Sequence, residues 1–245
     1  MMKRKLAISL GFAAAGFLAG AAIIPSQLEA VQSNPAAGEA LSGIPLPALI
    51  LAAGAQIAVL SFLLSLAGQW FAEKAGLRLA SPASGPWLAA AVLGGMGGAG
   101  LTALLDAYVF LPRLPQIEAV NVTWWKSLLA GVTYGGVFEE VGVRLFLMSA
   151  MAWLLLKRTQ GARPPWVFWT AIAASTFVFA AGHLPATAAL FGGLTPLIVA
   201  RAMLLNGALG FFFGYLYWKR GLSYAITAHM SAHLFLHGIV NGLIL

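Results

Sequence analysis

The chain has 245 residues, of which 60% are hydrophobic and 9% are charged, and its mean hydropathy is +0.87. Soluble domains carry a charge on about 25% of their residues, so this composition excludes a soluble globular protein and indicates an integral membrane protein. The sequence contains no cysteine, which excludes disulfides, thiolate metal sites and a cysteine nucleophile.

Apolar stretches long enough to cross a bilayer recur along the whole chain. A helix needs about 20 apolar residues to span the hydrocarbon, whereas the strands of a membrane barrel are shorter and alternate. We therefore predict an all-α membrane protein, a single polytopic bundle of about seven transmembrane helices. The expected spans are residues 6–24, 46–71, 87–111, 127–156, 166–184, 196–218 and 222–245.

The first span has the basic start and apolar run of a signal peptide. The run covers about 19 residues, longer than the usual apolar segment of about 7 to 15, and Leu28-Glu29-Ala30 is a poor cleavage site. We interpret this span as an anchor. Residues 1–43 are predicted to form an N-terminal anchor and external loop, and residues 44–245 one membrane domain with no separate soluble part. The longest loops are expected at residues 25–44 and 112–126.

The positions of the basic residues indicate which loops face the cytoplasm. Ten of the fourteen fall in loops on one side of the predicted bundle: Lys3, Arg4, Lys5, Lys74, Arg78, Lys157, Arg158, Arg163, Lys219 and Arg220. The positive-inside rule then places the N-terminus in the cytoplasm and the C-terminus outside. The net charge of +7 is thus explained by topology, so the expected partner is the lipid bilayer and not nucleic acid.

The fourth span contains three charges, Glu139, Glu140 and Arg144. Each charge near the membrane centre costs at least ~2.5 to 3.5 kcal/mol, which indicates a partnered, functional group. Glu140 and Arg144 are four residues apart and can pair along one helix face, whereas Glu139 is rotated by about 100°. We expect Glu140 and Arg144 to brace each other and Glu139 to be the reactive carboxylate. The alternative is a purely structural ion pair with a spectator.

All four histidines lie in the last 63 residues. His183 ends the fifth span, while His229, His233 and His237 recur every four residues along the last span and form a stripe with Asn241. Histidines at this spacing can bind zinc, as in the HExxH arrangement, or donate hydrogen bonds to an oxyanion. The spacing alone leaves both roles open.

Three ordered motifs on separate spans resemble the CAAX protease and bacteriocin-processing family of intramembrane proteases, also called CPBP or Abi. The resemblance is of the CAAX prenyl protease type 2-like kind and covers about residue 46 to the C-terminus. The family's EExxxR is matched by Glu139 to Arg144, its FxxxH by Phe179 to His183, and its final HxxxN/D is approximated by His229 to His233.

The last motif leaves its register open. His233 stands where the family most often has an amide or an aspartate, and His237 to Asn241 is a strict HxxxN. Residues 221–226 resemble the family's usual lead-in, which favours the pair His229 and His233.

The resemblance implies an intramembrane endopeptidase of a bacterial plasma membrane that cleaves a membrane-associated protein or peptide. Glu139 and His183 would activate water, and His229 and His233 would stabilise the oxyanion. Glu140, Arg144 and Phe179 would orient these groups. The resemblance leaves metal dependence open, because Glu139, His183 and His229 would suit zinc.

Two other functions use the same polar residues. The glutamates and histidines would serve as a relay in a proton- or cation-coupled transporter, although internal repeats and paired broken helices are lacking. The second alternative function is that of a non-catalytic immunity factor or scaffold.

The depth of the histidines in the membrane is a difficulty for the protease hypothesis. Straight helices would place His229 about 10 Å and His183 about 25 Å from the cytoplasmic ends of their spans. The side of substrate access stays open.

Overall fold

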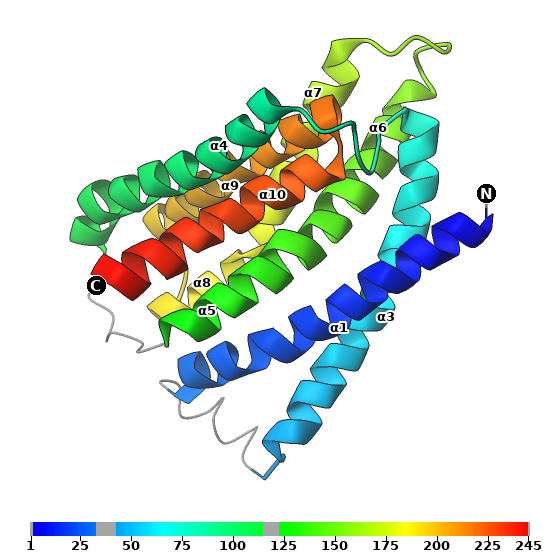
Figure 1. Ribbon diagram of the computed structural model, residues 1–245. Coiled ribbons are helices and arrows are strands. Elements are labelled where there is room, and N and C mark those ends of the chain that lie inside the picture. Colours follow the sequence, from blue (N-terminus) through cyan, green and yellow to red (C-terminus); the bar gives the residue numbers. More distant parts are fainter. Residues whose placement is uncertain (1, 33–42, 115–122, 245) are drawn as a thin grey trace.

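The computed structural model describes residues 2–32, 43–114 and 123–244, and within these ranges the chain is a bundle of helices (Figure 1). Five helical stretches are long and apolar enough to cross a membrane, and the prediction of an all-α membrane bundle is confirmed. The longer regular helices are α1 (Met2–Gln32), α3 (Leu46–Ala75), α4 (Gly85–Leu105), α7 (Pro165–Gly182) and α9 (Pro196–Arg220).

The two expected spans that carry the glutamates and the three spaced histidines are helical too, but parts of them are wound as π-helix. The first consists of α5 (Trp124–Ala130), the π-helical segments η3 (Gly131–Glu139) and η4 (Val141–Met148), and α6 (Ser149–Leu156). The second consists of α10 (Leu222–His233) and the π-helical segment η5 (Leu234–Ile244). π-Helical turns are rare and often mark functional sites.

Proline and glycine set the ends of several helices. α3 follows Pro45 and ends at Gly76, whose φ of +70° is the left-handed conformation that glycine adopts without strain. α9 begins at Pro196, and the Thr195 hydroxyl accepts a hydrogen bond from the Ile198 N–H at 3.3 Å. These residues explain why the predicted boundaries of both spans lie close to the observed ones.

The loop predicted at residues 25–44 is wrong in part. Residues 25–32 were expected in a loop, yet α1 continues through Pro25 to Gln32. The carboxylate of Glu29 holds this end, because it accepts hydrogen bonds from the Thr123 N–H at 2.9 Å and from the Lys126 ammonium. A short helix, α8 (Leu184–Phe191), also follows His183, since Pro185 fits the first turn of a helix.

α1 packs against α3 and η3, and α10 packs against α4, α9 and η3 (Figure 1). At the crossing of α1 and α3, Gly20 lies directly against the Ala53 carbonyl group. α1 is therefore part of the bundle.

After α4 the chain forms the π-helical segment η1 (Asp106–Phe110) and then the 3-10 turn η2 (Leu111–Arg113). Arg201 of α9 donates a hydrogen bond to the Asp106 carboxylate at 2.6 Å, which joins this end of α4 to α9.

Candidate active site

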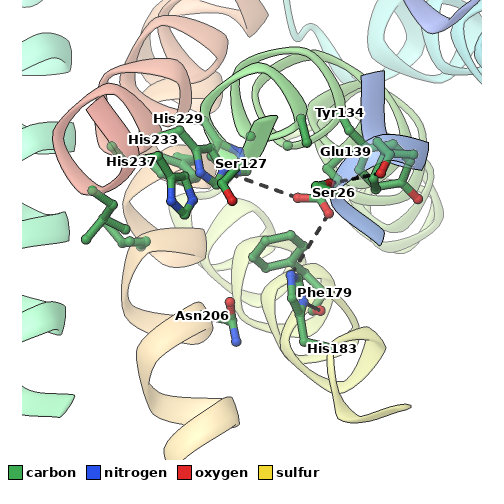
Figure 2. A pocket seen from close by; sticks show the side chains of 18 of the residues that line it. Ser26, Ser127, Tyr134, Glu139, Phe179, His183, Asn206, His229, His233 and His237 are labelled. Carbon is green, nitrogen blue, oxygen red and sulfur yellow. Dashed lines mark hydrogen bonds and ion pairs between the residues drawn. The ribbon is translucent and has the colours of Figure 1, made fainter. Parts of the chain in front are cut away.

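A cavity of about 310 Å³ lies among α1, η3, α7, α9 and α10. Glu139, His183, His229 and His233 all face it (Figure 2). The four residues assigned to catalysis by their motifs, which lie up to 94 positions apart in the sequence, therefore meet at one cavity.

Glu139 lies between two histidines. Its Oε1 atom is 4.0 Å from Nε2 of His183, and its Oε2 atom is 4.0 Å from Nε2 of His229. The difference in depth expected from straight, untilted helices is thus wrong. α7 ends at His183 beside the glutamate, and α10 brings His229 to its other side.

The ring of His183 is fixed by its own helix. Its Nδ1–H donates to the Phe179 carbonyl oxygen at 2.8 Å, and the two rings meet edge to face with centroids 4.7 Å apart. With the hydrogen on Nδ1, Nε2 presents a lone pair toward Glu139. The FxxxH spacing therefore both orients the histidine and selects its tautomer.

Glu140 has two partners. Its Oε1 atom lies 3.3 Å from Nη1 of Arg144, as the four-residue spacing predicts, and both side chains are fully buried. The same oxygen accepts a hydrogen bond from Nδ1–H of His229 at 2.9 Å. The second contact was missed, because it joins two helices that are 89 positions apart in the sequence. Glu140 is thus an orienting group for His229.

Arg144 is held by more than its carboxylate partner. Its Nη2 group donates to the Gly210 carbonyl oxygen at 2.6 Å. The guanidinium carbon lies 4.8 Å from the centre of the Phe179 ring and 5.8 Å from that of Phe213. Aromatic faces stabilise a cation through their quadrupole. Phe179 therefore separates Arg144 from His183 while contacting both.

His233 lies one helical turn beyond His229, with Nε2 atoms 3.2 Å apart. Its ring rests against Gly131 and Gly135, where an added Cβ atom would lie 2.5 Å from the imidazole. Both glycines were missed as site residues. Their four-residue spacing on the span that carries the glutamates is a signal that could have identified them, because it marks close approach of two helices.

His237 and Asn241 lie farther out on the same stripe. The ring of His237 stacks on His233 with centroids 5.4 Å apart, and the Asn241 side chain is exposed. The structure places His229, and not His237, beside Glu139 and Glu140. This geometry favours the register His229 and His233 for the last motif.

Further polar groups line the cavity away from the glutamates. Ser26 of α1, Ser127 of α5, Tyr134 of η3 and Asn206 of α9 face it (Figure 2). Their spacing follows no motif, so sequence reasoning missed them. They add hydrogen-bond donors and acceptors to the wall of the cavity.

The three candidate metal ligands, Glu139, His183 and His229, converge on one place. Zinc binds nitrogen and oxygen ligands at about 2.0 to 2.2 Å. Among the described residues, however, no group of three or more His, Asp or Glu side chains has its ligand atoms arranged to hold a metal ion. Zinc binding by Glu139, His183 and His229 stays a prediction from the sequence.

The comparison with protein families adds an independent observation. Residues 121–235, which contain all three motifs, match the family model described as type II CAAX prenyl endopeptidase Rce1-like. This part of the chain is Rce1-like in sequence. Neither a curated protein nor a solved structure matches the chain significantly.

The match supports, at the level of the family, an intramembrane CAAX endopeptidase, a class of enzyme that acts on a membrane-associated protein or peptide. It begins at residue 121, after the residues of α1, α3 and α4. The predicted division at residue 43 is not tested by this match, and it stays a prediction.

Proposed function

We propose that the protein hydrolyses a peptide bond of a membrane-associated substrate with water activated by Glu139 and His183. The observation that carries the proposal is the place of the Glu139 carboxylate, 4.0 Å from an imidazole nitrogen on either side. Polar atoms at this separation are too far apart for a direct hydrogen bond and suit a bridging water. Glu139 accepts one hydrogen of that water, and the Nε2 lone pair of His183 accepts the other.

In the first step, Glu139 takes a proton from water as the new oxygen–carbon bond forms at the scissile carbonyl. The carbonyl electrons move to its oxygen, which becomes the oxyanion of a tetrahedral intermediate. In the second step, the carbon–nitrogen bond breaks and Glu139 returns the proton to the leaving amine. The carboxylate is regenerated, so one peptide bond and one water give an acid and an amine.

His229 and His233 stabilise the oxyanion in this mechanism. Arg144, Glu140, His229 and Glu139 lie in series beside the cavity. Successive partners in this series are 3.3, 2.9 and 4.0 Å apart. When Glu139 takes the proton, the negative charge moves to the oxyanion, which is also next to His229. The buried cluster therefore keeps its net charge during the reaction, and a preorganised donor avoids reorganisation.

The test compares Glu139→Gln with Glu73→Gln, a matched change at an exposed carboxylate that pairs with Lys5. Both variants are reconstituted in liposomes with a library of membrane-associated peptides, and products are identified by mass spectrometry. We expect Glu139→Gln to lose about 10²- to 10⁴-fold in turnover, the usual contribution of a general base. Glu73→Gln should keep full activity.

Full activity of Glu139→Gln would refute the proposal. Ion flux through liposomes without cleavage of any peptide would favour the transporter hypothesis instead. A biological function that survives Glu139→Gln combined with His183→Ala would favour the scaffold hypothesis. Metal analysis of the wild type and Glu139→Gln tests the zinc prediction, because a stoichiometric metal lost in the variant would assign the carboxylate as a ligand.

A further inference from the structure

A second cavity, of about 230 Å³, lies between the end of α3 and the turn that joins α6 to α7. α3 and α6 pack against each other (Figure 1). Three cations line this cavity, Lys74, Lys157 and Arg163, and none of its described lining residues is acidic. It shares no described residue with the cavity at Glu139. It is therefore a separate feature of the fold, which the proposed catalytic mechanism does not use.

The positive charge of this cavity is not neutralised by its surroundings. Within the described part of the chain none of the three cations forms an ion pair, and Glu73, which precedes Lys74, pairs with Lys5. The C-terminal ends of α3 and α6 each carry about −0.5 of a charge, so they offset about one of the three positive charges. A net charge of about +2 remains, and it favours the binding of an anion.

The local backbone holds Arg163 in place. The turn before it closes on itself, because the Ala162 N–H donates to the Thr159 carbonyl oxygen at 3.0 Å. The Thr159 hydroxyl donates in turn to the Leu156 carbonyl oxygen at 2.9 Å. The guanidinium group rests on Gly76, where an added Cβ atom would collide with Nη1 of Arg163. The turn thus presents a guanidinium at a fixed place, and this group binds phosphate oxygens through two parallel hydrogen bonds.

Tryptophan rings lie directly beside the other two cations. Nζ of Lys157 is 3.8 Å from the centre of the Trp153 ring. Nζ of Lys74 is 5.8 Å from that of Trp70, and the two tryptophan rings meet edge to face with centroids 5.0 Å apart. Trp70 is 42% exposed, and tryptophan is enriched where a membrane meets water. The cations therefore lie at the level of the lipid headgroups, next to rings that can contact acyl chains.

We propose that this cavity binds the phosphate group of an anionic phospholipid, whose acyl chains lie along the exposed aromatic surface of α3 and α6. Basic pockets between membrane helices are sites for the headgroups of anionic lipids. The tryptophans favour a lipid over a free phosphate ion, because a free ion gains from the cations but not from the apolar rings. The bound lipid bridges the end of α3 and the turn after α6. Its binding does not depend on the proteolysis proposed for Glu139.

The test compares two double variants that lose the same charge. Lys157→Gln with Arg163→Gln removes two cations from the cavity. Arg158→Gln with Lys219→Gln is the matched control, because neither residue lines the cavity and Lys219 also lies over a tryptophan, Trp218, at 3.5 Å. The purified proteins in detergent micelles are titrated at constant ionic strength with phosphatidylglycerol or with phosphatidylcholine of the same chain length. Native mass spectrometry measures the bound lipid.

We expect the wild type and the control variant to bind one phosphatidylglycerol molecule at least about tenfold more tightly than phosphatidylcholine. Each cation near an anionic lipid contributes about fivefold in affinity, so the cavity variant should bind phosphatidylglycerol about 25-fold more weakly. Equal affinity of the wild type for both lipids, or an equal loss in the two double variants, would overturn the proposal.

Inorganic phosphate at the same concentration as the lipid is the competitor that separates the two sources of a phosphate group. We expect it to leave phosphatidylglycerol bound, and displacement of the lipid would show a site for a free anion and overturn the proposal. The comparison of the two lipids on the wild type needs no variant, so it decides the question even where a double variant fails to fold.

Discussion

Among single residues, Glu140 connects two helices of the site. It is fully buried and contacts both Arg144 and His229 through one oxygen. Its other oxygen, Oε2, is buried without a hydrogen-bond partner among the described residues. This carboxylate fixes the ring of His229 and neutralises the Arg144 guanidinium. Glu140 is a positioning residue, since it acts through His229 and does not line the cavity.

Glu140→Gln should lower turnover by ~10²-fold or more, because a neutral amide removes the carboxylate that orients the His229 ring through its Nδ1–H. It should also lower the free energy of unfolding by about 3 to 5 kcal/mol, since Arg144 becomes an unpaired buried charge. Turnover and unfolding are measured on the same reconstituted samples. Glu140→Gln with Arg144→Met should recover stability without recovering turnover. Recovery of both would show that the pair is structural only.

His233 offers a second prediction at the same scale. If it donates a hydrogen bond to the oxyanion, an amide should replace it and an alkyl side chain should not. We expect His233→Asn to stay within about tenfold of wild-type turnover and His233→Leu to lose about 10²- to 10³-fold, the usual cost of one oxyanion donor. Both variants must first show wild-type unfolding. Equal loss in the two variants would remove the donor role from His233.

At the scale of helices, glycine decides how closely α1 and α3 approach. An added Cβ atom on Gly20 would collide with the Ala53 carbonyl group, whereas one on Gly11 of the same helix meets nothing within 4 Å. The four-residue spacing of Gly16 and Gly20 is therefore a packing motif, of the kind that lets helix backbones touch. Through this contact α1 is held where its end lines the cavity.

Gly20→Ala should lower the free energy of unfolding by about 1 to 3 kcal/mol, because the bundle must move to accept the methyl group. Gly11→Ala is the matched control and should raise it by up to ~1 kcal/mol, since alanine favours a helix interior. Denaturant titration in detergent micelles measures both. Similar values for the two variants would show that the close approach of α1 and α3 does not contribute to stability.

For the whole molecule, the sequence was sufficient to predict the helical spans but not the contacts between helices. The expected spans match the helices because apolar length reports membrane crossing directly. Glu140 and Arg144 pair as predicted, since both lie on one helix face. The contact of Glu140 with His229 and the short distance from Glu139 to His183 depend on tilt and packing. Spacing along one helix contains no information about either.

A second ion pair inside the spans joins Asp106 to Arg201. It can be compared with the pair of Glu140 and Arg144, which lies beside the candidate active site. Both side chains are 18% exposed, and Nε of Arg201 donates to the carboxylate at 2.6 Å. Neither residue lines the cavity with the glutamates. The pair joins the end of α4 to α9, so its expected role is structural.

Asp106→Asn and Arg201→Gln should each lower the free energy of unfolding by about 1 to 3 kcal/mol, because each leaves a charged partner unsatisfied. The double variant should be more stable than the sum of the single changes predicts, with a coupling of about 0.5 to 3 kcal/mol. Turnover per folded molecule should stay at the wild-type value in all three, in contrast to the variants at Glu140. Loss of turnover at unchanged stability would instead connect this pair to the catalytic cavity through α9, which also contributes Asn206 to its lining.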